Sequence, residues 1–257
     1  MDQFLNIECI KTGIDGLDEM FEEGIPKGWP VIITGGPGSC KSILAAQFLC
    51  EGIKKYGQPG ILVLFEEPFS QVAYTMKKVN LDLFKYLKER KLLIIDASPS
   101  PTKLNTDLPV LVWDYLASVM GTEKRGLNLN EFYSLLTDCI REFRPERLVI
   151  DSISALKLYT PEKEFKFELA RVFKFLFDNK ITAFITAERP ESEALPTEYY
   201  LANGVIVTHY AKRASERFRA LEIVKMRGAK HRTKMVPMDI SDNGLTIFPD
   251  EKIFATD

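Results

Sequence analysis

The sequence predicts an α/β fold in which a mostly parallel central β-sheet carries helices on both faces and antiparallel strands along its C-terminal edge. Two observations predict it. Up to residue 186, short apolar runs alternate with longer helical stretches, and such continuous apolar strands are typical of a parallel sheet buried on both sides. After residue 200, strand-like runs follow one another with turn signals and no helix between them, which indicates antiparallel pairing.

The elements follow in a regular order. Strands of the parallel part are expected at 30–34, 60–65, 91–96, 147–151 and 181–186, and helices at 41–56, 69–79, 129–143 and 165–179. Antiparallel strands are expected at 203–210, 217–227, 236–241 and 245–248. The segments 97–109 and 188–198 contain several prolines among polar residues and are expected to be loops. No stretch has the composition of a linker, so we expect residues 1–257 to form a single domain.

Composition limits the class of protein. The chain has 257 residues, 46% apolar and 27% charged, with a net charge of −2, as expected for a soluble domain. Its N-terminus lacks a basic start followed by an apolar block, and the longest unbroken apolar run has five residues, so neither a signal peptide nor a membrane span is expected. Four cysteines without a C-x-x-C pair and two separated histidines argue against zinc and disulfides and favour the cytoplasm.

Residues 35–42, GGPGSCKS, come close to the phosphate-binding pattern G-x-x-x-x-G-K-[ST], with Cys40 in place of the second glycine. A buried strand precedes this loop and a helix begins at its end, so backbone N–H groups would point at bound phosphates. Lys41 would then reach the β- and γ-phosphates, and the Ser42 hydroxyl would ligate Mg²⁺. A Gly/Pro-rich turn that contains Lys-Ser by chance is the alternative, and the carboxylates at neighbouring strand ends make it less favoured.

Polar residues end three other predicted strands, and the carboxyl ends of parallel strands meet at one edge of the sheet, where ligands bind. Asp151 could hold magnesium through water. Glu66 or Glu67 could accept a proton from the water that attacks the γ-phosphorus, although two solvated glutamates at a helix start would look the same. Thr186 and Glu188 could sense the γ-phosphate.

A basic segment lies near the C-terminus. Residues 212–234 hold nine Lys or Arg against two Glu, a local charge of +7, so the rest of the chain sums to −9. Strand alternation predicts that Ile223, Lys225 and Arg227 face one way, and Glu222, Val224 and Met226 the other. The two cations would therefore project together and could grip a polyanion, either nucleic acid or the phosphates of a nucleotide.

Taken in order, these motifs resemble those of KaiC-type domains. They are the loop, FEEP, LLIIDASPSP, RLVIDS, ITAERPE, LANGVIVTHY, LEIVKMRGAKH and ISDNGLTIFP. KaiC-type domains are a branch of the RecA-like P-loop ATPases that includes the archaeal RadA paralogues. The resemblance runs from KTGIDGLDEM to TIFP, nearly the whole chain. It implies a RecA-like P-loop NTPase fold and slow, Mg²⁺-dependent ATP hydrolysis in a ring, usually a hexamer, with ATP bound between subunits.

The resemblance also implies roles for individual residues. Glu66 would be the catalytic base with Glu67 beside it, and Ser42 and Asp151 would hold the magnesium ion. The phosphates would be bound by Gly36, Pro37, Gly38, Ser39, Cys40, Lys41, Ser42 and Ile43. The neighbour's nucleotide would be contacted by Lys225, Met226, Arg227, Ala229, His231, Ser241 and Asp242. Lys225 and Arg227 would act as catalytic fingers supplied to the next subunit, a contact worth about 10³ to 10⁵ in rate.

Cys40 departs from the pattern. If the backbone there has a positive φ, a side chain costs about 1–2 kcal/mol, which would weaken ATP binding roughly 5- to 30-fold. Its place at a helix N-terminus beside Lys41 would also lower the pKa of the thiol. Since the other catalytic positions are retained, we expect a working but attenuated site.

Two alternatives to an active ATPase stay open. One is a nucleotide-sensing scaffold with little turnover, in which ATP governs assembly with an unidentified protein partner. The other is a DNA-repair accessory protein similar to the RadA paralogues. In recombinases of this fold the loops after Asp151 and Thr186 line the DNA channel, and here their charges are zero and −3, which disfavours DNA. The clock proteins of the family have two domains, so neither autokinase activity nor timekeeping is carried over.

Overall fold

The protein was analysed as a computed structural model, which describes residues 8–102, 107–112, 129–157, 160–189, 196–213 and 215–253. Within these residues ten strands form one sheet in the order β12-β11-β10-β9-β3-β8-β7-β4-β5-β6, and β1 pairs with β2. The strands are β1 Cys9–Ile10, β2 Ile25–Pro26, β3 Pro30–Gly35, β4 Gly60–Leu64, β5 Leu92–Asp96, β6 Val110–Val112, β7 Arg147–Asp151, β8 Thr182–Glu188, β9 Gly204–Arg213, β10 Glu216–Met226, β11 Val236–Ser241 and β12 Gly244–Ile247.

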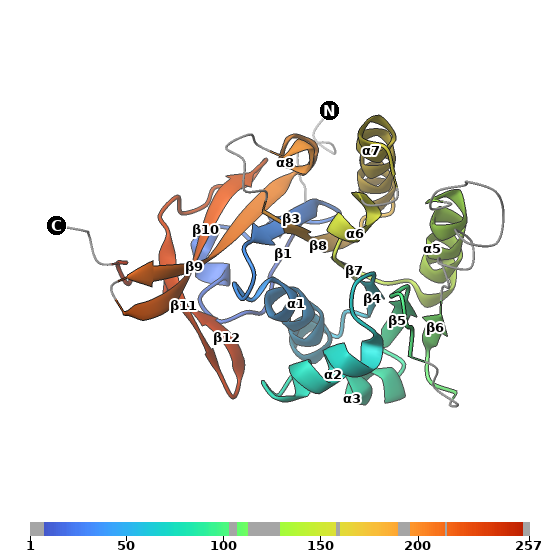
Figure 1. Cartoon of the computed structure of the whole chain (residues 1–257), viewed down its shortest axis with the longest axis horizontal. Helices are drawn as coiled ribbons and strands as arrows, with labels where there is room; N and C mark the ends of the chain where they lie inside the picture. The colour runs from blue at the N-terminus through green and yellow to red at the C-terminus, as the bar shows by residue number, and fades with distance from the viewer. Residues whose placement is uncertain are drawn as a thin grey trace.

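Helices cover both faces of the sheet (Figure 1). They are α1 Lys41–Tyr56, α2 Phe69–Lys77, α3 Leu83–Lys88, α5 Leu129–Phe143, α6 Ser154–Lys157, α7 Glu162–Asp178 and α8 Thr197–Leu201, with a short 3₁₀ helix at Asp18–Met20. Strands β9, β3, β8, β7, β4, β5 and β6 are parallel neighbours, whereas β9 to β12 pair antiparallel. The predicted fold class is therefore confirmed. No helix of the described residues is long and apolar enough to span a membrane.

The core divides into two layers because strand residues alternate between faces. On β3, Val31 and Ile33 belong to the layer that contains α1 to α3, whereas Ile32 belongs to the layer that contains α5 to α7. On β8, Phe184 faces the α1 side and stacks on Phe48 of α1 with a ring-centroid distance of 4.0 Å. Because β3 and α1 are both buried between other elements, the two ends of the loop that joins them are held in place.

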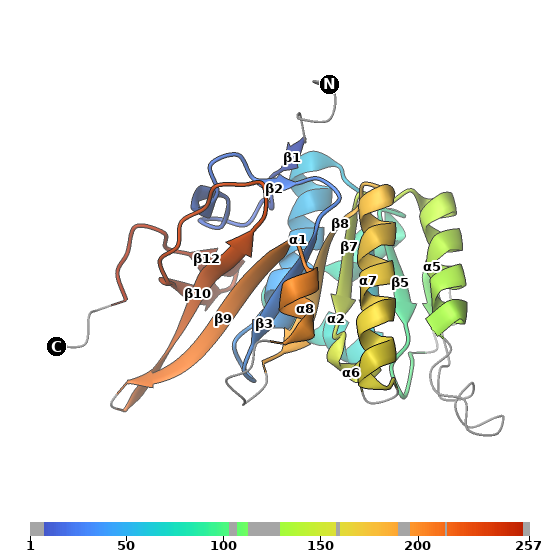
Figure 2. The same ribbon diagram turned by 90° about the horizontal axis from the view of Figure 1, so that it is seen from above.

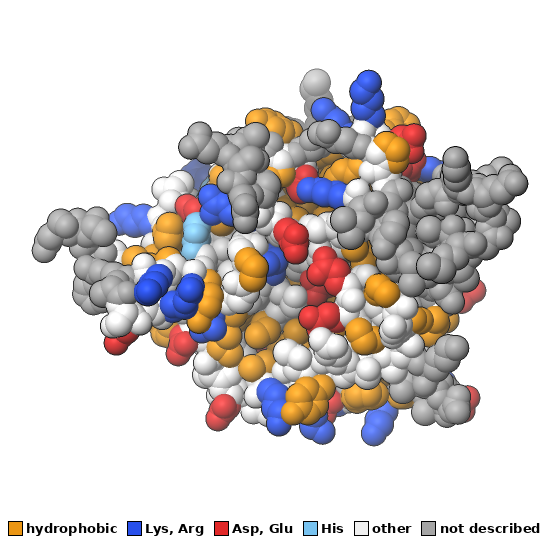
Figure 3. All heavy atoms as spheres, viewed as in Figure 1, with side chains coloured by type: hydrophobic (Ala, Val, Ile, Leu, Met, Phe, Trp, Pro, Cys, Tyr) orange, Lys and Arg blue, Asp and Glu red, His pale blue; other side chains and the backbone are white. Residues whose placement is uncertain are grey.

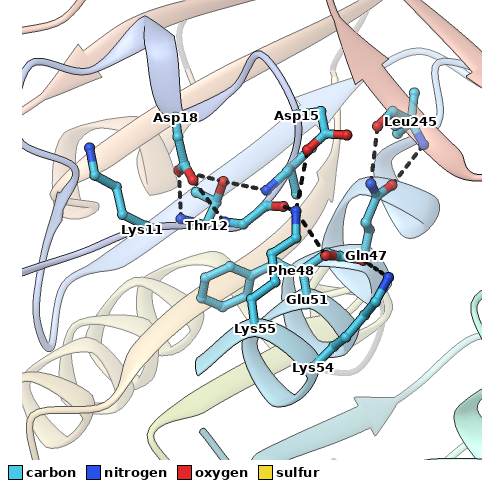
Figure 4. A network of polar contacts seen from close by, with 12 residues as sticks. Lys11, Thr12, Asp15, Asp18, Gln47, Phe48, Glu51, Lys54, Lys55 and Leu245 are labelled. Carbon is cyan, nitrogen blue, oxygen red and sulfur yellow. Dashed lines mark hydrogen bonds and ion pairs between the residues drawn. The ribbon is translucent and has the colours of Figure 1, made fainter. Parts of the chain in front are cut away.

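The N-terminal segment is fastened to the C-terminal half of α1 (Figure 4). Asp18 accepts hydrogen bonds from the backbone N–H and the hydroxyl of Thr12, and Lys55 of α1 pairs with Asp15 and Glu51. The fully buried Arg147 donates to carbonyls of this segment and of α1. Burial lowers the pKa of Arg147 to about 10. These contacts hold the C-terminal end of α1, the helix whose N-terminal end follows the phosphate-binding loop.

Two sequence predictions were wrong, and some elements were not predicted. The 188–198 segment was expected to be a loop, but part of it forms helix α8, while 190–195 lie outside the described residues. Helix α3 and strand β6 were not predicted; α3 begins at the side-chain cap of Asp82, which accepts the Lys85 N–H. On β10 the alternation fails, because a bulge between Ile223 and Lys225 shifts the register and leaves Ile223 and Met226 both buried and Val224 exposed.

Candidate functional site

The loop between β3 and α1 has the form of a phosphate cradle. Lys41 Nζ lies 2.9 Å from the Gly35 carbonyl oxygen and 3.1 Å from that of Gly36. The buried Ser39 hydroxyl lies 2.7 Å from the Gly36 carbonyl oxygen and 2.8 Å from Thr208 Oγ1 on β9, which fixes the loop from beneath. A Cβ on Gly36 would meet no atom within 4 Å, so this part of the loop faces open space. The first-turn N–H groups of α1 have no place in the helix ladder and remain available to an anion.

Cys40 is the N-cap of α1 and has a φ of 73°, in the left-handed region. The strain inferred from the sequence is therefore present in the fold. This strain reduces the free energy of unfolding. The expectation of a lowered thiol pKa was wrong, because burial raises the pKa of Cys40 more than Arg219 and Lys41 lower it.

The carboxylates predicted at the strand ends lie around Lys41. Burial lowers the pKa of Lys41, and the charges of Asp151, Glu188 and Glu66 oppose this shift. Thr186 donates a short hydrogen bond to Asp151 Oδ1. Figure 3 looks onto this carboxyl edge of the parallel strands and shows acidic side chains gathered near its centre. The structure thus brings together the loop, Asp151, Thr186, Glu188 and Glu66.

Glu66 lies at the carboxyl edge with an exposed side chain, close enough to Lys41 for their charges to interact. Its carboxylate accepts a hydrogen bond of 2.6 Å from the Ser152 hydroxyl. Desolvation raises the pKa of Glu66, which the charges of Asp151 and Glu188 raise further, while the Ser152 hydrogen bond and Lys41 lower it. Glu67 lies beside it with an exposed side chain.

Two residues that position Glu66 and the segment after it were not singled out from the sequence. Ser152 orients Glu66, and nothing in RLVIDS marks that serine apart from its place after Asp151. Asp96 is fully buried at the end of β5, where it accepts the N–H of Phe69 at 2.8 Å, the N–H of Thr102 at 2.8 Å and the Ser98 hydroxyl at 2.6 Å. Asp96 thereby fixes the start of α2, directly after the two glutamates. The sequence did contain a signal for Asp96, because it is an acidic residue that ends an apolar strand shortly before Ser98-Pro99.

Lys225 and Arg227 lie at the opposite edge of the sheet from the loop. Met226 pairs with Gly204, which is level with Val31 near the start of β3, whereas the loop begins at Gly35. Four strand residues separate the two levels by about 13 Å. The sequence prediction that the two cations project together holds, since both donate to the Tyr200 carbonyl. Neither cation is placed to contact its own subunit's phosphate loop.

The remaining predicted contact residues divide between the two edges. Met226 is buried, and Ala229 and His231 lie beside the N-terminal segment, where His231 bridges to Phe21. Ser241 and Asp242 lie instead at the turn after β11, a strand that runs in the direction of β3, and the Asp242 carbonyl accepts a hydrogen bond from Asn80. Within one subunit the set therefore does not form one cluster.

The residues at the carboxyl edge fit ATP with magnesium. Ser42 and Asp151 offer the hard oxygen donors that Mg²⁺ prefers, and this ion normally takes its other ligands from water and substrate phosphates. No cluster of three or more His, Cys, Asp or Glu that could hold a metal by itself occurs in the described part of the chain.

Comparison with known proteins agrees with this geometry. The family model described as "ATPase: KaiC" matches residues 10–252. The crystal structure of a KaiC-like protein from the archaeon Pyrococcus horikoshii superposes with a TM-score of 0.78 at 30% identity, covering 95% of this chain and all of that one. A UPF0273 protein of Methanocaldococcus jannaschii is 32% identical over 255 residues, 94% of this chain and 97% of that protein.

Longer relatives match over one part of their length. The circadian clock protein KaiC3 of Synechocystis is 30% identical over 249 residues, which cover 95% of this chain and 46% of that protein. The chain therefore spans less than half of the clock proteins that it matches.

Proposed function

The chain belongs to the KaiC family of ATPases, and from this we propose that it is a Mg²⁺-dependent ATPase whose nucleotide sites are completed by neighbouring subunits in a ring. One observation carries the proposal: the phosphate loop and the base lie at one edge of the sheet, while Lys225 and Arg227 lie at the other. The phosphate loop of one subunit can therefore meet Lys225 and Arg227 only if a second copy of the chain supplies them. A closed ring provides every site with a neighbour.

Within one subunit, the chemistry follows from the carboxyl edge. The loop N–H groups and Lys41 bind the phosphates, for which Lys41 gives up its contacts with the Gly35 and Gly36 carbonyls. Ser42 and Asp151 would hold magnesium, which would neutralise charge on the phosphates. Ser152 orients Glu66, whose raised pKa suits a base that takes a proton from the attacking water. Glu67 lies beside this base as a second carboxylate.

The neighbouring subunit supplies positive charge. In phosphoryl transfer, negative charge spreads over the γ-phosphoryl oxygens, and an arginine supplied by a neighbour stabilises it by about 10³ to 10⁵ in rate. Lys225 and Arg227 take this role, with Met226, Ala229 and His231 shaping the surface that carries them. Ser241 and Asp242 lie at the end of β11 and in the turn after it, and the proposal that they contact the neighbour's nucleotide rests on the family resemblance alone.

Mixing two inactive variants tests the shared site. Lys41→Ala removes phosphate binding but leaves the fingers, and Arg227→Ala removes a finger but leaves the loop. Each variant alone should hydrolyse ATP at least 10²-fold more slowly than the unaltered protein, and an equimolar mixture should recover activity. Arg141→Ala, on the exposed side of α5, is the control and should hydrolyse normally. No recovery in the mixture would refute the shared site.

The positive φ of Cys40 favours a second candidate, a nucleotide-sensing scaffold with little turnover. In that case ATP binding would promote assembly, and the unaltered protein would bind ATP without hydrolysing it. Hydrolysis by Cys40→Gly but not by the unaltered protein would select this candidate.

The charge count against DNA binding changes in one respect. Lys157 and Glu198, counted in the two separate loops, form an ion pair in which Glu198 is buried, so neither is a free surface charge. Residues 158–159 and 190–195 of these loops lie outside the described residues. No observation on the described residues favours the DNA-repair candidate.

A further inference from the structure

The ion pair between Lys157 and Glu198 joins the two halves of the nucleotide machinery within one subunit. Lys157 Nζ donates a short hydrogen bond to Glu198 Oε1. The Glu198 side chain is 1% exposed, while that of Lys157 is 38% exposed. A buried carboxylate is held in place by its partner, because separating them would leave a charge without water or a counter-ion. The pair therefore fixes α6 against α8, two short helices on the same face of the sheet (Figure 2).

At one end of this connection is the segment from Ser152 to Lys157, which follows Asp151 in the subunit's own site and which we call the catalytic loop. Helix α6 begins at Ser154, two residues after Ser152, which holds Glu66. The Ser154 hydroxyl also accepts the Glu188 N–H at 2.8 Å, and the Ile153 N–H donates to the Thr186 carbonyl at 3.0 Å. Lys157, at the end of α6, thus extends from the segment that contacts both the base and the end of β8.

At the other end are the fingers. Lys225 Nζ donates hydrogen bonds to backbone carbonyls at the end of α8. The distances to the carbonyl oxygens are 2.7 Å for Tyr199, 3.4 Å for Tyr200 and 2.7 Å for Ala202, the residue after the helix, and these are all of its hydrogen bonds in the described residues. Arg227 Nη2 also donates to the Tyr200 carbonyl, at 3.3 Å. Cations are stabilised at a helix C-terminus, where carbonyls lack partners in the helix. The position of α8 therefore sets the position of both cations.

We propose that Lys157 and Glu198 are positioning residues, which place Lys225 and Arg227 for the neighbour's nucleotide by fixing α8 to the catalytic loop. This inference rests on the proposed shared site and names the contact that connects one site to the next around the ring. It follows that Glu198 matters in the subunit that donates fingers. In the subunit whose own phosphate loop hydrolyses ATP, we expect it to be dispensable, because the bonds of Ile153 and Ser154 to the end of β8 still hold the segment beside Glu66.

The mixing experiment separates these roles. Glu198→Gln keeps the shape of the side chain and removes its charge, and Lys157 is exposed enough to be solvated when its partner is neutral. Added to the Lys41→Ala finger donor, Glu198→Gln should lower the recovered activity about tenfold or more, since small displacements of catalytic groups have effects of this size. Added to the Arg227→Ala subunit, Glu198→Gln should leave the recovered activity within about twofold of the mixture without it, a much smaller effect than the tenfold loss.

Three further results decide the inference. Lys157→Met in the finger donor should reproduce the loss, and Lys157→Arg, which keeps the ion pair, should restore activity. Equal losses in both mixtures would mean that the pair only supports folding, and would overturn the inference while leaving the shared site intact. No recovery in the mixture without Glu198→Gln would overturn the shared site, and this inference with it.

Discussion

At the scale of single residues, Cys40 carries a cost that glycine would remove. A non-glycine residue at positive φ costs about 1–2 kcal/mol, and the greater chain entropy of glycine in the unfolded state offsets about 0.5–1 kcal/mol of this. We therefore predict that Cys40→Gly raises the free energy of unfolding by about 1 kcal/mol, measured by urea denaturation without nucleotide. Cys40→Ala keeps the Cβ and should give no such gain. Equal stabilisation by both variants would assign the effect to the thiol.

Ser152 and Glu66 lead to a prediction about pH. Glu66 must be ionised to accept a proton, so hydrolysis should fall as the pH drops through its raised pKa. The Ser152 hydrogen bond favours the charged form, so Ser152→Ala should raise the pKa of Glu66 further and move the acidic limb of the pH–rate profile to higher pH. Ser154→Ala, whose hydroxyl does not contact Glu66, should leave the limb in place. An acidic limb that Ser152→Ala does not move would argue against Glu66 as the base.

At the scale of elements, Asp96 shows how one buried side chain can hold a catalytic segment. Asp96→Ala would leave the Phe69 and Thr102 N–H groups without their acceptor. We predict a loss of roughly 2–4 kcal/mol in the free energy of unfolding, as for several hydrogen bonds to a charged group. ATP hydrolysis should fall as well, because α2 follows Glu66 and Glu67. Asp82→Ala, which removes the exposed cap of α3, is the control and should cost only about 1 kcal/mol. Equal costs would contradict the role of Asp96.

The sequence predicted the elements whose signals are local and continuous. Apolar strands followed by Gly, Asp or Glu were sufficient to place the loop, Asp151 and Glu66 at one edge of the sheet. Helix α8 and the bulge on β10 were missed, because α8 is stabilised by tertiary contacts through Glu198 and Lys225, and a bulge leaves no mark in strand alternation. Ser152 and Asp96 were missed for a related reason: their importance lies in partners that are distant in sequence.

At the scale of the whole molecule, the basic segment has a different meaning from the one its charge suggests. Its Lys and Arg residues do not form a single patch. Arg219 lies by the phosphate loop, where its Nε is 3.4 Å from the Gly38 carbonyl oxygen, whereas Lys225 and Arg227 lie at the far edge. Strand β10 crosses from one edge to the other, so the segment places cations at both edges of the sheet. If the proposed shared site is correct, this arrangement makes hydrolysis depend on oligomerisation.

The central claim, that a nucleotide site is complete only between subunits, is tested most directly by Mg²⁺-ATP hydrolysis across a range of protein concentrations, with assembly followed by analytical ultracentrifugation in the same buffer. The account predicts that hydrolysis per subunit rises with the fraction of assembled protein and that Arg227→Ala removes this rise. Constant hydrolysis per subunit down to concentrations at which the protein is monomeric would contradict it.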